Sequence, residues 1–231
     1  MCRSREPGRL RTAALAYTDG RIGRAVSLGV KHFAALYGFE IVHEEVISRP
    51  PFDYSALMRR IKSKRPDAVL VGLDHTRPDE PMHSCIVEAQ KAGLKSTSIW
   101  LSDNPSAEDS KLGNAIDGVF MRATWVSMDP DPLSKNFAQS FGAAYGIKPK
   151  YHAAGGYACC QVLQQAVEAT GDFNNETLRE TLLRRTFTNA MGKLRFGENG
   201  LSSGPMKLCQ WQNGKLEIVY PDPERTAAPV L

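Results

Sequence analysis

Apolar residues along the first part of the chain follow two different spacings. In short runs nearly every residue, or every second residue, is apolar, which is typical of strands. In the longer segments between these runs, apolar residues recur every three or four positions, which is typical of helices. The strand patterns cover residues 12–17, 39–47, 68–73, 98–101 and 118–121. The helical patterns cover residues 22–37, 54–65, 81–93 and 107–115.

This alternation predicts the fold class of residues 11–123. Strands that alternate with helices imply right-handed crossovers and a parallel sheet. The run at residues 68–73 (AVLVGL) is apolar throughout, as expected of a central strand that is covered on both faces. We therefore predict an α/β fold, a doubly wound parallel sheet of about five strands with helices on both faces.

After Trp125 the alternation stops. A turn rich in aspartate and proline at residues 128–132 precedes three helical patterns at residues 133–145, 152–170 and 176–185. Asn174 or Asn175 is expected to cap the third of these helices. The last strand patterns lie at residues 194–196, 206–211 and 216–220. Asn213-Gly214 separates the final two, and this dipeptide between strand patterns predicts a β-hairpin.

The composition is that of an ordinary globular protein. The 231 residues carry a formal net charge of +4 and are 42% hydrophobic. No apolar stretch approaches the ~20 residues needed to span a bilayer. Residues 1–8 contain no apolar segment, so we expect no secretory signal peptide. The basic run at residues 59–65 ends a helical pattern and contains no aromatic residues, which favours a solvated helix end over a nucleic-acid site.

Cysteine usage indicates neither a disulfide framework nor a metal site. The count of five is odd, and the sequence has no Cys-x-x-Cys pair and no suitably spaced histidine. Cys159 and Cys160 lie in an apolar helical pattern, where we expect buried thiols. No nucleophile is paired with a base, so we predict no catalytic residue, no cofactor and no enzyme activity.

Glycines and aspartates after the strand patterns are the candidates for binding chemistry. Gly20 and Gly23 lack the third glycine of a dinucleotide site and the Lys-Ser/Thr of a phosphate loop, so we predict no nucleotide site. The carboxyl ends of parallel strands meet at one edge, where open α/β sheets bind their ligands. Asp19, Asp74 and Asp103 would lie there. Caps or strand-edge turns are expected of three other aspartates, Asp53, Asp67 and Asp109.

The roles of the three aspartates at this edge differ. For Asp19 we favour a cap on the following helix. Asp74, which His75 follows directly, and Asp103 each precede their helix by several residues. For Asp74 and Asp103, contact with a ligand and helix capping are equally open.

Four segments resemble, in order and spacing, the type I periplasmic ligand-binding proteins, and among them the Leu/Ile/Val-binding receptors of ABC transporters for branched-chain amino acids. The segments are ALAYTDGRIGRAVSLGVKHFAALYGFEIV, FDYSALMRRIKSKRPDAVLVG, FAQSFGAAYGIKPKYHAAGGYACCQVLQQAVEATG and FGENGLSSGPMKLCQWQNGKLEIVYP. Members of this family have two lobes and trap the ligand between them. The matching stretches lie within residues 13–221.

The resemblance implies a domain plan. Residues 11–123 would form the α/β domain of lobe 2, and residues 206–221 a C-terminal hairpin that returns to it. Residues 124–205 would be the helical part of an incomplete lobe 1. The N-terminal segment of lobe 1 has no counterpart in this sequence, so we expect a truncated form. Its lobe 1 helices would expose an apolar patch and self-associate.

The resemblance also implies a ligand site. Receptors for aliphatic amino acids place aromatic residues on the first and third loops of lobe 2 and an acid on the fourth. The matching positions here are Ile22, Asp74 and Asp103, and we add His75 because it follows Asp74. The acid is kept, while both aromatic residues are replaced, one of them by a second acid. This set implies a cationic, amide or polyhydroxyl ligand rather than leucine.

The function implied is that of a non-catalytic receptor subunit of an ABC-type importer for amino acids or related small polar solutes. Its partners would be the small-molecule ligand and a membrane permease, and its location the periplasm. Without a signal peptide, the chain as given would stay in the cytoplasm. A second interpretation is therefore a cytoplasmic ligand-sensing regulator on the same fold.

Overall fold

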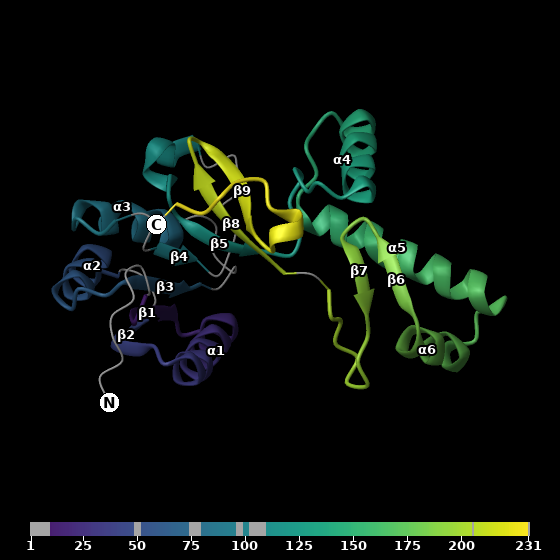
Figure 1. Ribbon diagram of the computed structural model, residues 1–231, viewed down its shortest axis with the longest axis horizontal. Helices are drawn as coiled ribbons and strands as arrows, with labels where there is room; N and C mark the ends of the chain where they lie inside the picture. The colour runs from purple at the N-terminus through teal and green to yellow at the C-terminus, as the bar shows by residue number, and fades with distance from the viewer. Residues whose placement is uncertain are drawn as a thin grey trace. The chain divides into compact units, whose positions relative to one another are not determined.

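A computed structural model describes residues 10–48, 52–73, 80–95, 99–101, 110–204 and 206–230. The chain divides into two compact units (Figure 1). The first unit comprises Met1–Arg122, Cys209–Glu217 and Ala228–Leu231. The second unit comprises Ala123–Leu208 and Ile218–Ala227.

Within the described residues the main sheet has seven strands, in the order β2-β1-β3-β4-β5-β8-β9. Its first five strands pair in parallel. The predicted parallel sheet at residues 11–123 is therefore confirmed. The strands are β1 (Thr12–Thr18), β2 (Glu40–Ile47), β3 (Ala68–Gly72), β4 (Ile99–Leu101) and β5 (Phe120–Ala123).

The two strands at the centre of this parallel group are buried because helices cover both faces of the sheet. Ala14, Leu15 and Ala16 of β1 have no exposed surface, and Val69 and Val71 of β3 are at most 1% exposed. The helices are α1 (Arg21–Tyr37), α2 (Tyr54–Ser63) and α3 (Glu80–Lys91). α1 packs against β1 and β3, whereas α2 and α3 pack against each other on the other side of the sheet (Figure 1).

Local sequence signals account for the ends of these helices. Asp53 caps α2, because its Oδ1 accepts a hydrogen bond from the backbone N–H of Ala56 at 2.8 Å. Gly38 ends α1 in the left-handed conformation at φ 73°, which glycine adopts without steric cost. Asp67 accepts bonds from the backbone N–H groups of Arg11 and Thr12, which fixes the start of β1. Asp53 and Asp67 were predicted to be caps or strand-edge turns, and both are confirmed. Asp109, of which the same was expected, lies outside the described residues.

Two predictions in this unit are wrong. Asp19 does not cap α1, because Gly20 occupies the N-cap position without a side-chain hydrogen bond, and Asp19 instead pairs with Arg24. The helix expected at residues 107–115 is a 3₁₀ segment at Ser110–Ile116. Its helical geometry is broken at Gly113, where φ is 50° and ψ is −133°.

The second unit is built from α4 (Pro132–Tyr145), α5 (Tyr151–Thr170), α6 (Asn175–Arg184) and an antiparallel pair of strands, β6 (Thr186–Asn189) and β7 (Gly192–Arg195). All three helices were predicted. Asn174, rather than Asn175, caps α6, and its Oδ1 accepts from the N–H groups of Glu176 and Thr177.

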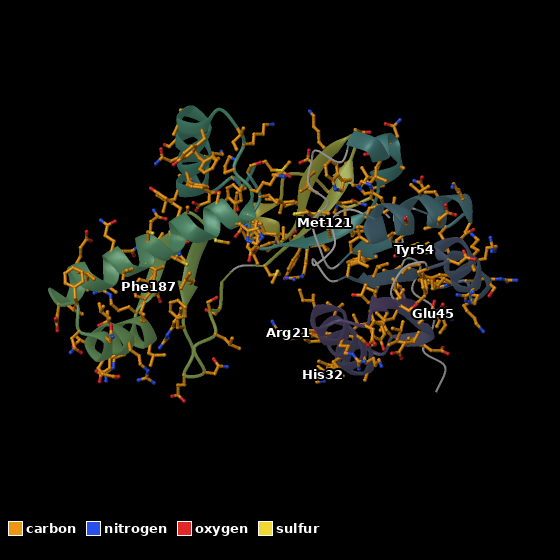
Figure 2. All side chains as sticks on the ribbon, turned by 180° about the vertical axis from the view of Figure 1, so that it is seen from behind. Arg21, His32, Glu45, Tyr54, Met121 and Phe187 are labelled. Carbon is orange, nitrogen blue, oxygen red and sulfur yellow. The ribbon has the colours of Figure 1, made fainter. Side chains whose placement is uncertain are left out.

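Two apolar clusters hold the second unit together. Trp125 and Phe137 pack with Ala154 and Ala190 in the first cluster. In the second cluster, α5 and α6 cover Phe187 of β6, which is 1% exposed (Figure 2). Cys159 and Cys160 are exposed, not buried as predicted. The reason is that α5 turns Ala154, Ala158, Val162 and Ala166 inward, and the cysteines lie outside this stripe.

The chain ends in the predicted hairpin of β8 (Lys207–Gln212) and β9 (Lys215–Tyr220), followed by a short 3₁₀ turn, η3 (Asp222–Glu224). Asn213 and Gly214 both have positive φ, 52° and 72°, as a two-residue hairpin turn requires. No helix among the described residues is both long and apolar enough to cross a membrane.

Candidate functional site

The carboxyl edge of the parallel sheet is the candidate ligand-binding edge. β1, β3 and β4 are neighbours and run in parallel, so their carboxyl ends at Thr18, Gly72 and Leu101 lie on the same edge. In open α/β sheets, ligands bind outside the carboxyl ends of the strands. Asp74, His75 and Asp103, which were predicted from the sequence, lie outside the described residues. The strands that precede them end at this edge.

Ile22 is the predicted site residue that the structure describes. It is half-buried in the first turn of α1, which begins at the carboxyl edge because it follows β1 directly. Beside Ile22, Gly23 packs so closely on β1 that an added Cβ would lie 2.2 Å from the carbonyl oxygen of Thr18. Thr18 in turn donates from its hydroxyl to the carbonyl oxygen of Gly72 on β3, at 3.5 Å.

These contacts show why position 23 is a glycine. The first turn of α1 lies directly against the last residue of β1. A side chain at this position would push the helix off the sheet. Gly23 therefore lets α1 start close to the carboxyl edge, with Ile22 near the end of β1.

Charged and polar groups on α1, β1 and β2 pair with one another. Asp19 and Arg24 form an exposed ion pair. Glu44 accepts from the hydroxyl of Tyr17 at 3.0 Å and pairs with Lys31 at 2.5 Å. The hydrogen bond from Lys31 lowers the pKa of the Glu44 carboxyl. Arg21 is exposed in the first turn of α1 (Figure 2).

Cys85 is a fully buried thiol on α3. Burial raises the pKa of the Cys85 thiol to about 12, so it stays protonated and unreactive near neutral pH. Among the described residues, no group of three or more histidine, cysteine, aspartate or glutamate side chains could hold a metal ion.

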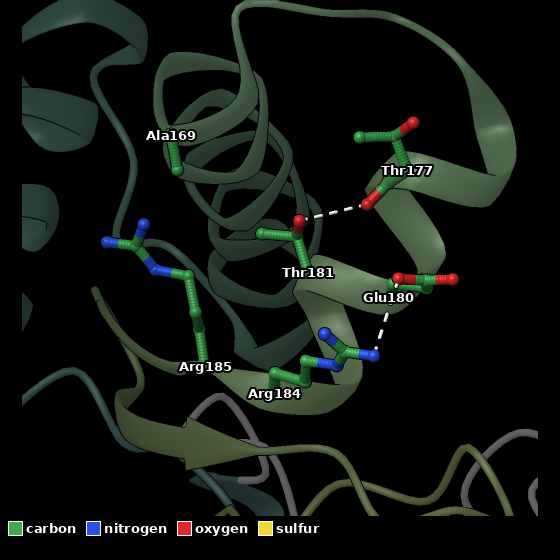
Figure 3. Close-up of a pocket in the computed structure, with 6 residues that line it drawn as sticks. All are labelled: Ala169, Thr177, Glu180, Thr181, Arg184 and Arg185. Carbon is green, nitrogen blue, oxygen red and sulfur yellow. Dashed lines mark hydrogen bonds and ion pairs between the residues drawn. The ribbon is translucent and has the colours of Figure 1, made fainter.

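The structure also shows a shallow pocket that the sequence did not predict (Figure 3). It has a volume of about 250 Å³ and lies between α5 and α6 in the second unit. Glu180 pairs with Arg184 across its wall at 3.5 Å, and this pair is exposed to solvent. The lining residues are Ala169, Thr177, Glu180, Thr181, Arg184 and Arg185. Because its charged groups face water, this pocket lacks the buried polar anchors of a ligand site.

Comparisons with known proteins agree with the fold. A sequence model of a family described as "Periplasmic binding protein" matches residues 5–215. The Leu/Ile/Val-binding protein BraC3 of Rhizobium johnstonii is 27% identical over 212 residues, which cover 88% of this chain and 55% of that protein. The chain therefore spans about half the length of the curated relatives it matches.

Solved structures share the fold at low sequence identity. A putative branched-chain amino acid ABC transporter protein of Rhodospirillum rubrum superimposes with a TM-score of 0.79 at 19% identity, over 90% of this chain and 60% of that one. A solute-binding protein of an ABC transporter from R. palustris, in complex with benzoate, gives a TM-score of 0.73 at 21% identity, over 91% and 58% of the two chains.

The family match covers most of the chain and agrees with the parallel sheet seen in the structure. The family consists of non-catalytic binding proteins, as the sequence predicted. The chain belongs to the family of periplasmic binding proteins, and it resembles the Leu/Ile/Val-binding members of that family.

Proposed function

We propose that this chain forms part of a ligand-binding receptor subunit of an ABC-type importer for amino acids or related small polar solutes. The observation that carries the proposal is the family match over residues 5–215. Several relatives are named as Leu/Ile/Val-binding proteins, and structural neighbours as ABC transporter proteins. Periplasmic binding proteins work outside the inner membrane, so the partner we propose is a membrane permease, and the location the periplasm.

We further propose that residues 11–123 and 206–221 belong to one lobe of this receptor, and residues 124–205 to the other. The division into two compact units supports a two-lobed arrangement. The proposed lobe boundaries follow the family resemblance. They differ from the boundaries of the compact units at residues 206–208 and 218–221, which belong to the second unit.

The proposed ligand contacts are Ile22, Asp74, His75 and Asp103. Their support is topological, since the strands before Asp74 and Asp103 are adjacent and parallel and end at one edge. Two carboxylates favour a ligand that carries ammonium, amide or hydroxyl groups, because a carboxylate that a bound ligand shields from water needs hydrogen-bond donors. A neighbour with the same fold binds benzoate, which is not an amino acid. A ligand other than leucine is therefore compatible with this fold.

The test needs a two-lobed protein, in which residues 1–231 are joined to the part of a relative that the chain does not span. Amines, amides, polyols, branched-chain amino acids and benzoate are screened by thermal shift, and hits are measured by calorimetry. Replacing Asp103 by Ala should weaken binding of an amine ligand by about 2–5 kcal/mol, because one partner of a desolvated pair is lost.

The matched control is Glu40→Gln, since Glu40 is exposed and begins β2 at the opposite edge of the sheet. This variant should bind the ligand as the parent does. If Asp103→Ala binds as tightly as the parent, the proposed contact is wrong. If no member of the panel binds the two-lobed protein, the proposed solute class is wrong as well.

A further inference from the structure

A buried lysine lies where the chain passes between its two compact units. The passages are at Arg122–Ala123, Leu208–Cys209, Glu217–Ile218 and Ala227–Ala228. Lys207 stands directly before the second of them, at the start of β8, and its side chain is 2% exposed. Lysine is almost never buried to this degree unless it is paired.

Lys207 is paired with two carboxylates from different segments. Its Nζ lies 2.8 Å from Oδ2 of Asp129, whose side chain is also 2% exposed. It lies 2.5 Å from Oε2 of Glu224, which is 32% exposed. Burial by itself would lower the pKa of Lys207, but the hydrogen bonds to Asp129 and Glu224 outweigh it and raise that pKa. The lysine is therefore charged at neutral pH.

Each carboxylate stands beside a different passage. Asp129 follows the first passage, and it also accepts from the N–H of Asp131, the residue that caps α4. Glu224 ends η3, shortly before the chain leaves the second unit after Ala227. One ammonium group thus joins three segments that are far apart in the sequence.

A second contact involves the fourth segment, which enters the second unit at Ile218. Thr226 donates from its backbone N–H to the carbonyl oxygen of Ile218, and its hydroxyl accepts from the Ile218 N–H, both at 2.8 Å. Ile218 is the residue at which β9 enters the second unit. All four segments of the second unit that lead to the first unit are therefore held by the Lys207 ion pairs or by this Thr226–Ile218 contact.

We propose that Lys207 is a positioning residue of the second unit, where it fixes the segments that lead to the first unit. Its charge holds the segments at Asp129, at Lys207 itself and at Glu224 in one arrangement. Apolar residues of similar size are often at least as stabilising as a buried ion pair, so the role we assign to this one is to fix that arrangement. The proposal concerns the chain itself and does not depend on the ligand proposed above.

Hydrogen exchange followed by mass spectrometry on the full chain tests the proposal. Lys207→Met keeps an unbranched side chain of similar length and removes the charge. Backbone amides at residues 125–131 and at residues 218–226 should then exchange at least ~10-fold faster, because the buried carboxylate of Asp129 and the partly buried one of Glu224 lose their partner. Amides of β1 and of the interior of α5 should exchange as in the parent. Lys207→Arg, which keeps the charge, should restore most of the protection.

The matched control is Lys215→Met, which removes an exposed lysine from the other strand of the same hairpin. It should leave exchange at both segments unchanged. A Lys207→Met effect confined to residues next to position 207, or seen at only one of the two segments, would overturn the proposal.

If Lys207→Met unfolds the whole chain, β1 also loses its protection from exchange. A second variant then tests whether the segments are coupled. Glu224→Gln is milder, because Glu224 is partly exposed. It should speed exchange in the segment of Asp129, which Glu224 reaches through Lys207. Unchanged exchange around Asp129 in Glu224→Gln would show that the three segments are not coupled, and the proposal would be wrong.

Discussion

At the scale of single residues, the sequence predicts contacts between residues that are only a few positions apart. Asp53 stands directly before a helical pattern, and it caps α2 as expected. Asp19 stands in a similar place and does not cap α1, because the N-cap falls on Gly20. Gly23, in the first turn of α1, lies directly against Thr18 at the end of β1. This contact depends on packing against β1, which no local pattern reports.

Gly23 and Gly29 lie in the same helix and should respond to alanine in opposite ways. An added methyl at Gly23 would meet the backbone of Thr18 at 2.2 Å, so Gly23→Ala should cost about 1–3 kcal/mol through displacement of α1. At Gly29 nothing lies within 4 Å, so Gly29→Ala should add about 0.5–1 kcal/mol through helix propensity alone.

Urea unfolding of the two variants and the parent measures both effects. The circular dichroism of the folded state shows whether α1 is still helical. Equal stabilities for the two variants would show that α1 is not held against Thr18 as the structure has it.

At the scale of elements, segments with a clear pattern of apolar residues were predicted, even where they are as short as β4 and β5. The spacing of apolar residues predicts the parallel strands and the helices α4, α5 and α6. β6 was missed because Thr186–Asn189 is short and shows no pattern of its own. Contacts with β7 and α5 hold β6 in place instead. β7 pairs with one side of β6, and α5 contributes side chains to its backbone.

Two glutamines of α5 perform this second role. Gln165 donates from Nε2 to the carbonyl oxygen of Thr188 at 2.8 Å, and Gln161 accepts from the N–H of Ala190 at 2.8 Å. In the sequence, two glutamines four residues apart indicate only a polar face of a helix. The structure shows that they bind the backbone of Thr188 and Ala190.

Gln165→Ala should therefore weaken the attachment of β6 to α5. We expect a loss of about 1–2 kcal/mol, since the backbone groups of Thr188 lose a partner. Gln164→Ala is the matched control on the same helix, because Gln164 bonds the exposed side chain of Glu168. Its stability should stay within ~0.5 kcal/mol of the parent. Chemical unfolding compares the two, and equal losses would mean that the Gln165 contact does not stabilise β6.

At the scale of the whole molecule, the sequence predicted the fold class, whereas the place of the candidate site stays a prediction. The site residues themselves were chosen by the family resemblance, and Asp74, His75 and Asp103 lie outside the described residues. The Lys207 ion pairs could not have been predicted. Their three members are far apart in the sequence, and each one by itself has the pattern of a surface residue. Only the return of the chain to the second unit brings them together.

The apolar surface of the chain leads to the last prediction. Large apolar side chains are exposed on α4 and α5, where Tyr145 is 68% and Leu163 is 52% exposed, and on α1, where Leu28 is 69% and Leu36 is 64% exposed. Many exposed apolar side chains on one surface favour association between molecules. Residues 1–231 expressed alone should therefore elute as species heavier than the 25.5 kDa monomer, with a mass that rises with concentration.

Size-exclusion chromatography with light scattering measures this association, and paired variants locate it. If the surface of α4 and α5 is responsible, as the sequence predicted, Tyr145→Ser with Leu163→Glu should shift the chain toward monomer. Leu28→Glu with Leu36→Glu on α1 should then leave the mass unchanged, although it removes as many exposed apolar side chains. The reverse result would assign the association to α1. A parent chain that stays monomeric at all concentrations would mean that the exposed side chains on these helices do not drive association.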